Sequence, residues 1–202
     1  FAAGAEVFII GLSKKVILAN MLGAVADSII EANVGIISPA QAWLGAAFYM
    51  LQIYYDFCGY SEMAIGLGRI FGFDFMKNFD YPYISTSITE FWKRWHISLS
   101  SWFRDYLYIP LGGNRKGNVY VNLSIVFLAT GIWHGADWSF ILWGVWHGLF
   151  MLIERYLKKN PISIPLPKAV KQALGWIYTM LVVLLGWVVF RIANIPKAVK
   201  FI

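Results

Sequence analysis

The chain has 202 residues, of which 59% are hydrophobic and only 14% are charged. Because a soluble globular domain usually carries about 25% charged residues, this composition argues against a soluble domain and predicts an integral membrane protein. The formal net charge of +6 does not indicate nucleic-acid binding, because the basic residues stand in scattered pairs between apolar runs. Lysines and arginines that flank the cytoplasmic ends of membrane spans give this pattern.

Apolar stretches along the chain predict helices, and a helix needs about 20 apolar residues to cross a bilayer. In chain order the stretches are residues 5–30, 41–55, 119–133, 136–153 and 173–190. Several are short for a full crossing, and irregular backbone at membrane depth is tolerated only inside the protein or beside a water-filled cavity. We therefore predict an all-α, polytopic integral membrane protein whose compact helical core includes re-entrant helices.

Residues 84–110 predict a helix of a different kind. Ser87-Ile88-Thr89-Glu90 is a capping box, which places the helix start near Ile88. Apolar residues then recur at helical spacing, namely Phe91, Trp95, Leu99, Trp102 and Tyr106. We expect one interfacial or re-entrant helix, followed by a glycine-rich basic loop over residues 110–117. A second linker, residues 158–167, holds three prolines and separates the last span.

The two ends of the sequence suggest a fragment. The first six residues lack the basic start and the cleavage pattern of a secretory signal, and the chain begins with Phe1 and stops at Ile202. We expect an internal or C-terminal part of a longer chain, with residues 1–202 forming a single membrane-embedded core. Because Cys58 is the only cysteine, an intrachain disulfide is excluded.

Three histidines are the candidates for chemistry, because an imidazole is costly in an apolar stretch and exchanges protons near neutral pH. His134 follows an apolar stretch and lies between Gly131 and Gly135, where we predict a helix break. There it can act as a general base for a hydroxyl group. The alternative is a histidine that only bonds a backbone carbonyl freed by the break.

The other two histidines have different settings. His96 lies on the less apolar face of the helix that we predict from near Ile88 to before Pro110, where it lines a polar channel or faces lipid head groups. His147 has Gly144 and Gly148 beside it, which favours close helix packing over catalysis. Both His134 and His147 stand in a Trp-His-Gly word.

A metal site is not predicted. Imidazole ligands suit zinc and copper, but the sequence has no His-x-x-x-His or His-x-His pair. No glycine-rich phosphate-binding motif is present either. The basic pairs Lys93-Arg94 and Arg115-Lys116 suit two uses, the phosphates of a donor or the phosphates of lipids.

Several long sequence words carry a family resemblance: residues 54–68, 78–83, 90–100, 102–113 and 130–135. They resemble the signature of the membrane-bound O-acyltransferase family. Within it the chain is most similar to the bacterial branch of alginate O-acetyltransferase membrane subunits, and the D-alanyl transfer protein of teichoic acid synthesis is a close relative. The resemblance covers nearly the whole chain. Cys58 stands where relatives often have serine.

This resemblance implies a multi-pass acyltransferase of the bacterial inner membrane that O-acetylates an exported polysaccharide such as alginate. The implied donor is acetyl-CoA or another cytoplasmic acyl carrier, with no tightly bound cofactor. The acceptor is the polysaccharide or a periplasmic or extracellular acetyltransferase partner. The family's essential histidine maps onto His134 and its second polar position onto His96. The resemblance gives no catalytic role for His147.

Three alternatives remain open at this stage. One is D-alanyl transfer to teichoic acid from a carrier protein. Another is a transporter or flippase whose histidines relay protons, although the predicted span over residues 173–190 holds no charged residue. The third is an inactive scaffold of a secretion complex. An acyltransferase predicts that His134→Ala abolishes transfer while the protein still inserts and folds.

Overall fold

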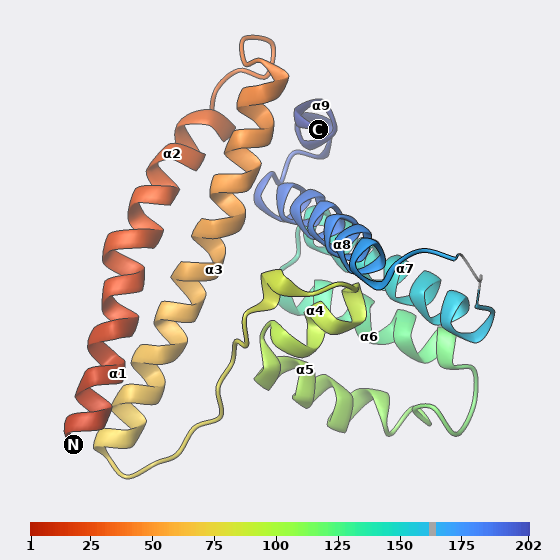
Figure 1. Ribbon diagram of the computed structural model, residues 1–202, viewed down its shortest axis with the longest axis horizontal. Helices are drawn as coiled ribbons and strands as arrows, with labels where there is room; N and C mark the ends of the chain where they lie inside the picture. The colour runs from red at the N-terminus through yellow and green to blue at the C-terminus, as the bar shows by residue number, and fades with distance from the viewer. Residues whose placement is uncertain (162–164) are drawn as a thin grey trace. The chain divides into compact units, whose positions relative to one another are not determined.

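The computed structural model describes residues 1–161 and 165–202, and every regular element in these residues is a helix (Figure 1). This confirms the all-α class. The chain divides into two compact units, one made of residues 1–79 with 199–202 and the other of residues 80–198. A single core over residues 1–202 stays a prediction. The middle of the predicted linker over 158–167, residues 162–164, lies outside the described residues.

The first unit is a long helical hairpin. Its first arm runs without interruption through α1 (Ala2–Ser13), the π-helix η1 (Lys14–Ala19) and α2 (Asn20–Ile30), and its second arm is α3 (Pro39–Ile70) (Figure 1). The arms approach closely where both carry glycine. A Cβ on Gly11 would lie 2.6 Å from the carbonyl oxygen of Gly59, so only glycine permits this contact.

Ion pairs explain why both arms are longer and more regular than the apolar stretches predicted. Lys14 pairs with Glu62, and Lys15 pairs with Asp56, each from the first arm to the second. The two lysines therefore do not interrupt the first helix, and the two carboxylates do not end α3 near residue 55 as expected. An ionised side chain between apolar helices is tolerated when it is paired.

The second unit holds the remaining long helices. These are α6 (Val119–His134), α7 (Trp138–Lys159) and α8 (Lys168–Arg191), preceded by the short elements η2 (Pro82–Ile84), α4 (Ile88–Arg94), α5 (Ile97–Phe103) and the π-helix η3 (Arg104–Tyr108). A short helix, α9 (Ile195–Phe201), follows α8. A Cβ on Gly144 would come within 2.5 Å of the Phe127 carbonyl oxygen, which shows how tightly α6 and α7 pack.

Two of the described helical stretches, Ala2–Ile30 and Lys168–Arg191, are long and apolar enough to cross a membrane, and Val119–His134 is a shorter apolar helix. They correspond to the apolar stretches predicted at 5–30, 173–190 and 119–133. The total number of crossings stays a prediction.

The prediction of a single helix that starts near Ile88 and ends before Pro110 is wrong. The chain leaves the helical conformation after Arg94, since Trp95 is extended and His96 is left-handed, with φ 48° and ψ 54°. A left-handed residue cannot continue a right-handed helix. The predicted apolar face is therefore split: Phe91 and Trp95 are 0% and 3% exposed, whereas Trp102 and Tyr106 are 52% and 69% exposed.

Candidate active site

The site begins with an anchored helix start at α4. Ser87 caps the helix, because its hydroxyl accepts the backbone N–H of Glu90 at 3.0 Å. Glu90 accepts the backbone N–H of Thr86 in return, and this hydrogen bond holds the pKa of the Glu90 carboxyl below its usual range. The cap confirms the predicted start of the helix near Ile88.

A second carboxylate holds the same helix start from a distant part of the chain. Glu154 of α7 accepts the backbone N–H groups of Ile88 and Thr89, the latter at 2.8 Å, and the Thr89 hydroxyl at 2.6 Å. The exposed N–H groups of a helix N-terminus favour a negative charge at this position. Glu154 therefore fixes α4 against α7. Sequence reasoning missed this residue.

His96 occupies the break at the other end of α4. It is a non-glycine residue with positive φ, a conformation that costs about 1–3 kcal/mol and gathers at functional sites. Its carbonyl accepts the N–H of Ser100 at 3.0 Å, which begins α5. Its Nδ1 lies 3.4 Å from the Ser98 hydroxyl. The left-handed backbone at His96 thus separates α4 from α5.

His134 is the last residue of α6, and the helix break predicted there is confirmed. Gly135 follows with φ 154° and ψ 175°, a region that is essentially restricted to glycine. A Cβ at this position would also meet the Phe140 ring at 2.8 Å. The His134 ring lies edge-on to Trp143 and Phe190, at centroid distances of 5.0 and 5.2 Å.

The two histidines share one cavity of about 470 Å³ within the second unit, a volume in the range typical of small-molecule sites. The Trp133 ring next to His134 lies 6.2 Å from the His96 ring. Apolar and aromatic side chains form much of the wall, including Trp92, Leu123, Val126 and Phe127. The structure therefore places the two predicted site residues, one from each helix break, on the same space.

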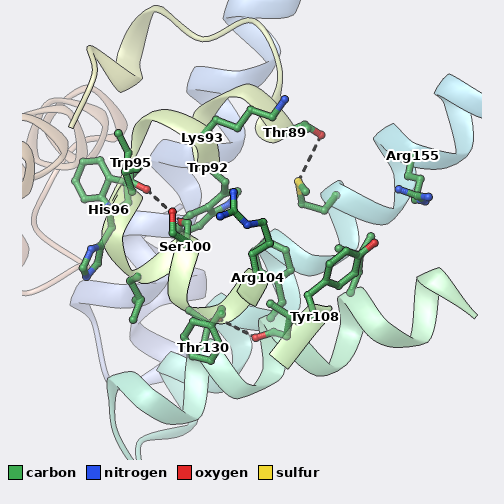
Figure 2. Close-up of a pocket in the computed structure, with 18 of the residues that line it drawn as sticks. Thr89, Trp92, Lys93, Trp95, His96, Ser100, Arg104, Tyr108, Thr130 and Arg155 are labelled. Carbon is green, nitrogen blue, oxygen red and sulfur yellow. Dashed lines mark hydrogen bonds between the residues drawn. The ribbon is translucent and has the colours of Figure 1, made fainter. Parts of the chain in front are cut away.

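Basic side chains also line the cavity. They are Lys93, Arg104 and Arg155, of which Arg104 is paired with Asp105, and Figure 2 shows His96 on one side and Arg155 on the other. Arg155 also borders a neighbouring hollow with Lys158 and Lys159. Only Lys93 among these was singled out from the sequence. The arrangement suits a ligand with an anionic part and a small reacting part.

The other predicted basic candidates have different surroundings. Arg94 forms ion pairs with Glu90 and Asp80, so its charge is neutralised by carboxylates near α4. Arg115 and Lys116 line a separate hollow along the glycine-rich loop, together with Arg104. They contribute positive charge beside the main cavity without lining it.

His147 does not line the cavity. It is 0% exposed and lies within an aromatic cluster, edge-on to Trp92 and Trp143 at centroid distances of 5.1 and 5.2 Å. This position agrees with the predicted packing role. Cys58, in the first unit, is buried with its Sγ 3.6 Å from a carboxylate oxygen of Glu62. Among the described residues, no group of three or more His, Cys, Asp or Glu side chains lies together as metal ligands would.

An all-helical unit with two imidazoles and basic side chains on one cavity suits transfer of a small group from an anionic donor. Comparison with known proteins specifies the class. The sequence profile of the MBOAT, membrane-bound O-acyltransferase family matches residues 1–193, and the chain belongs to this family.

Curated relatives with acetyl-transfer names match nearly the whole chain, and a D-alanyltransferase matches about half of it. It is 50% identical over 200 residues to probable alginate O-acetylase AlgI of Azotobacter vinelandii, an alignment that covers 98% of this chain and 39% of the relative. It is 42% identical over 203 residues to peptidoglycan O-acetyltransferase of Helicobacter pylori, covering 98% and 38%. Teichoic acid D-alanyltransferase of Bacillus subtilis is 33% identical over 120 residues, covering 55% and 30%. The chain thus spans about two fifths of the first relative's length.

Proposed function

We propose that this chain carries the active site of an O-acetyltransferase that acts on an exported polysaccharide of the alginate type. The observation that carries the proposal is the placement of His96 and His134, from two helix breaks, on one cavity. The 50% identity to probable alginate O-acetylases supports the acyl group and the class of acceptor. The protein is a multi-pass component of the bacterial inner membrane.

His134 is the general base of the proposed reaction. Its neutral imidazole accepts the proton of the acceptor hydroxyl while the hydroxyl oxygen attacks the carbonyl carbon of the acetyl donor. The C–S bond of a thioester donor then breaks, and the imidazolium returns its proton to the thiolate. Atoms and charge balance without a further reactant. A positioned base of this kind contributes about 10²–10⁴-fold to the rate.

His96 has the second role, that of stabilising the reacting groups. Its imidazole is held by the strained backbone between α4 and α5, and a fixed polar group near developing charge needs no rearrangement during the reaction. The Ser98 hydroxyl near its Nδ1 limits the orientation of the ring. We assign His96 to the transition state's developing negative charge, which it stabilises as a hydrogen-bond donor.

The donor binds beside the basic residues of the cavity. Acetyl-CoA, or another cytoplasmic carrier with a phosphorylated arm, presents its phosphates to the basic residues Lys93, Arg104 and Arg155, which line the cavity. Guanidinium groups match phosphate geometry particularly well. The acetyl thioester then reaches toward the histidines. No tightly bound cofactor is required.

Short helices beside the cavity support a re-entrant core of the family's type. The helix α4 has seven residues, and α5 continues into η3 and ends at Tyr108. These stretches are about 10 and 18 Å long, too short for a bilayer core of about 30 Å. Helices that stop inside the protein can open a passage through it. We propose that the acceptor, a polysaccharide or a periplasmic acetyltransferase partner, meets the acetyl group in such a passage.

The alternative acceptors and acyl groups follow from the relatives. The peptidoglycan O-acetyltransferase at 42% identity suggests transfer of the same acetyl group to a different polymer, peptidoglycan. D-alanyl transfer is the weaker alternative, because the D-alanyltransferases of Bacillus subtilis and Streptococcus thermophilus match 55% and 70% of the chain at 33% identity.

The test is a mass-spectrometric comparison of the surface polymers of three strains: the intact strain, a deletion strain, and the deletion strain complemented with full-length His134→Ala protein. We expect acetyl esters on an exported polysaccharide in the intact strain and not in the other two. Acetyl esters on peptidoglycan alone would identify a peptidoglycan O-acetyltransferase, and D-alanyl esters would identify a D-alanyltransferase. Unchanged polymers in the deletion strain would refute acyl transfer.

A further inference from the structure

His147 is the least expected polar residue of the second unit. It is completely buried, and neither of its ring nitrogens has a hydrogen-bond partner among the residues that the structure describes. A neutral imidazole carries one donor and one acceptor, and leaving both unpaired in a buried position is unfavourable. An apolar ring would fill the same space without that cost. The nitrogens of His147 therefore need a purpose that packing alone does not supply.

Buried hydrogen-bond donors that need an acceptor lie around His147. The indole N–H groups of Trp92, Trp143 and Trp187 are also buried, and within the described chain they have no acceptor. The centroid distances from the His147 ring to these three rings are 5.1, 5.2 and 6.4 Å. At the two shorter separations the rings are in edge-to-face contact, so an unpartnered indole N–H and an unpartnered imidazole nitrogen belong to neighbouring rings.

Of these three indoles, Trp92 is the one that also lines the cavity of the two histidines. It comes from α4, four residues before His96, whereas His147 belongs to α7. A hydrogen bond between them would join the helix that leads to His96 to the helix that follows His134. Trp143 extends the connection, since its ring lies edge-on to both His134 and His147.

The helix α8 prevents the imidazole from moving away. A Cβ on Gly186 would meet Nε2 of His147 at 2.6 Å, so the ring lies directly against the α8 backbone. The neighbouring Trp146 donates its indole N–H to the Val182 carbonyl at 2.9 Å. The ring is thus confined between α4, α7 and α8.

We infer that His147 is a positioning residue: its imidazole accepts the Trp92 indole N–H and so fixes the cavity wall between the two histidines. This inference rests on the proposed acyl transfer for its kinetic consequence only. It assigns no contact between His147 and the substrate.

The test uses full-length protein with two changes at this position. His147→Phe keeps an aromatic ring and removes both nitrogens, and His147→Gln keeps a donor and an acceptor. We expect His147→Phe to lower kcat about tenfold or more with KM for acetyl-CoA unchanged, since misplacement of the site costs rate more than binding. His147→Gln should recover most of the lost kcat. Trp92→Phe removes the other partner of the hydrogen bond and should lower kcat to the same extent. It provides the test if His147→Phe protein does not fold.

The matched control is Trp146→Phe, which removes the adjacent hydrogen bond to Val182. It should lower the melting temperature and leave kcat unchanged. A His147→Phe protein with wild-type kcat would overturn the inference, as would equal losses in His147→Phe and His147→Gln. A Trp146→Phe protein that loses kcat to the same extent would also overturn it.

A readout independent of acyl transfer separates this inference from the proposed function. The ultraviolet resonance Raman band of the indole N–H should shift toward the unbonded position in His147→Phe and keep its position in His147→Gln. If wild-type protein transfers no acyl group, the proposed function fails and the Raman comparison still decides the inference. An identical band in wild type and His147→Phe would contradict it.

Discussion

The two Trp-His-Gly words of this chain have the same three residues and opposite structural roles. In Trp133-His134-Gly135 the helix ends, because Gly135 adopts a conformation that other residues avoid, and His134 lines the cavity. In Trp146-His147-Gly148 the helix continues, and these residues of α7 contact the neighbouring helices α6 and α8. The difference teaches that the backbone around a histidine, and not the sequence word, decides whether its imidazole can reach a substrate.

The glycines show this contrast at atomic distances. A Cβ at Gly135 would strike the Phe140 ring at 2.8 Å in a backbone conformation that already demands glycine, whereas a Cβ at Gly148 would lie 3.0 Å from the Phe127 Cβ in ordinary helix. One glycine ends a helix at the site, and the other lets α6 approach α7.

The largest effect should come from the first word's histidine. We expect His134→Ala to lower the rate of acyl transfer about 10²–10⁴-fold, because it removes the base, with little change in melting temperature. Purified full-length protein and a radiolabelled acetyl donor give the measurement. A correctly folded variant that keeps the wild-type rate would place the chemistry elsewhere.

His96 should give the next largest effect and separate strain from chemistry. We expect His96→Gly and His96→Ala to lose activity to a similar extent, about 10²-fold. Their stabilities should differ by about 1 kcal/mol in favour of glycine, which accepts a positive φ without strain. Turnover and thermal unfolding of both proteins provide the check. If His96→Gly retained full activity, only the backbone turn would matter.

Alanine at the two glycines should sharpen the comparison directly. Gly135→Ala should destabilise the protein by about 1–3 kcal/mol and lower the rate, because it moves the end of α6 that carries His134. Gly148→Ala should lower the melting temperature by less and leave the rate of each folded molecule unchanged. Equal rate losses in the two variants would remove the distinction between the words.

The two tryptophans should give the smallest effect. Trp146→Phe removes the hydrogen bond to the Val182 carbonyl and should lower stability by about 1 kcal/mol. Trp133 is exposed, so Trp133→Phe should change stability by less. Thermal unfolding of the two variants in the same detergent tests the order. The reverse order would show that the second word is not the packing element.

Much of the fold was predictable because it depends on local patterns. The cap at Ser87, the apolar length of residues 173–190 and the glycine after His134 each act within a few residues, and each prediction matches the structure. The shared placement of His96 and His134 followed from family resemblance, since spacing alone does not bring two helix breaks together.

The features that were missed depend on long-range contacts. His96 takes a left-handed conformation that its residue type does not demand, so the local pattern favoured a continuous helix. Glu154 binds the α4 start from more than sixty residues away. Arg104 and Arg155 reach the same cavity from different helices. No local sequence signal marks these contacts.

Chemical rescue of full-length His134→Ala protein by free imidazole tests the central claim most directly. If the first Trp-His-Gly word supplies the proton acceptor, the variant should be nearly inactive and should regain acetyl transfer as imidazole concentration rises. In the wild-type protein the His147 imidazole does not line the cavity, so imidazole should not restore the rate of His147→Ala protein in this way. Wild-type turnover by His134→Ala without added imidazole would contradict the account.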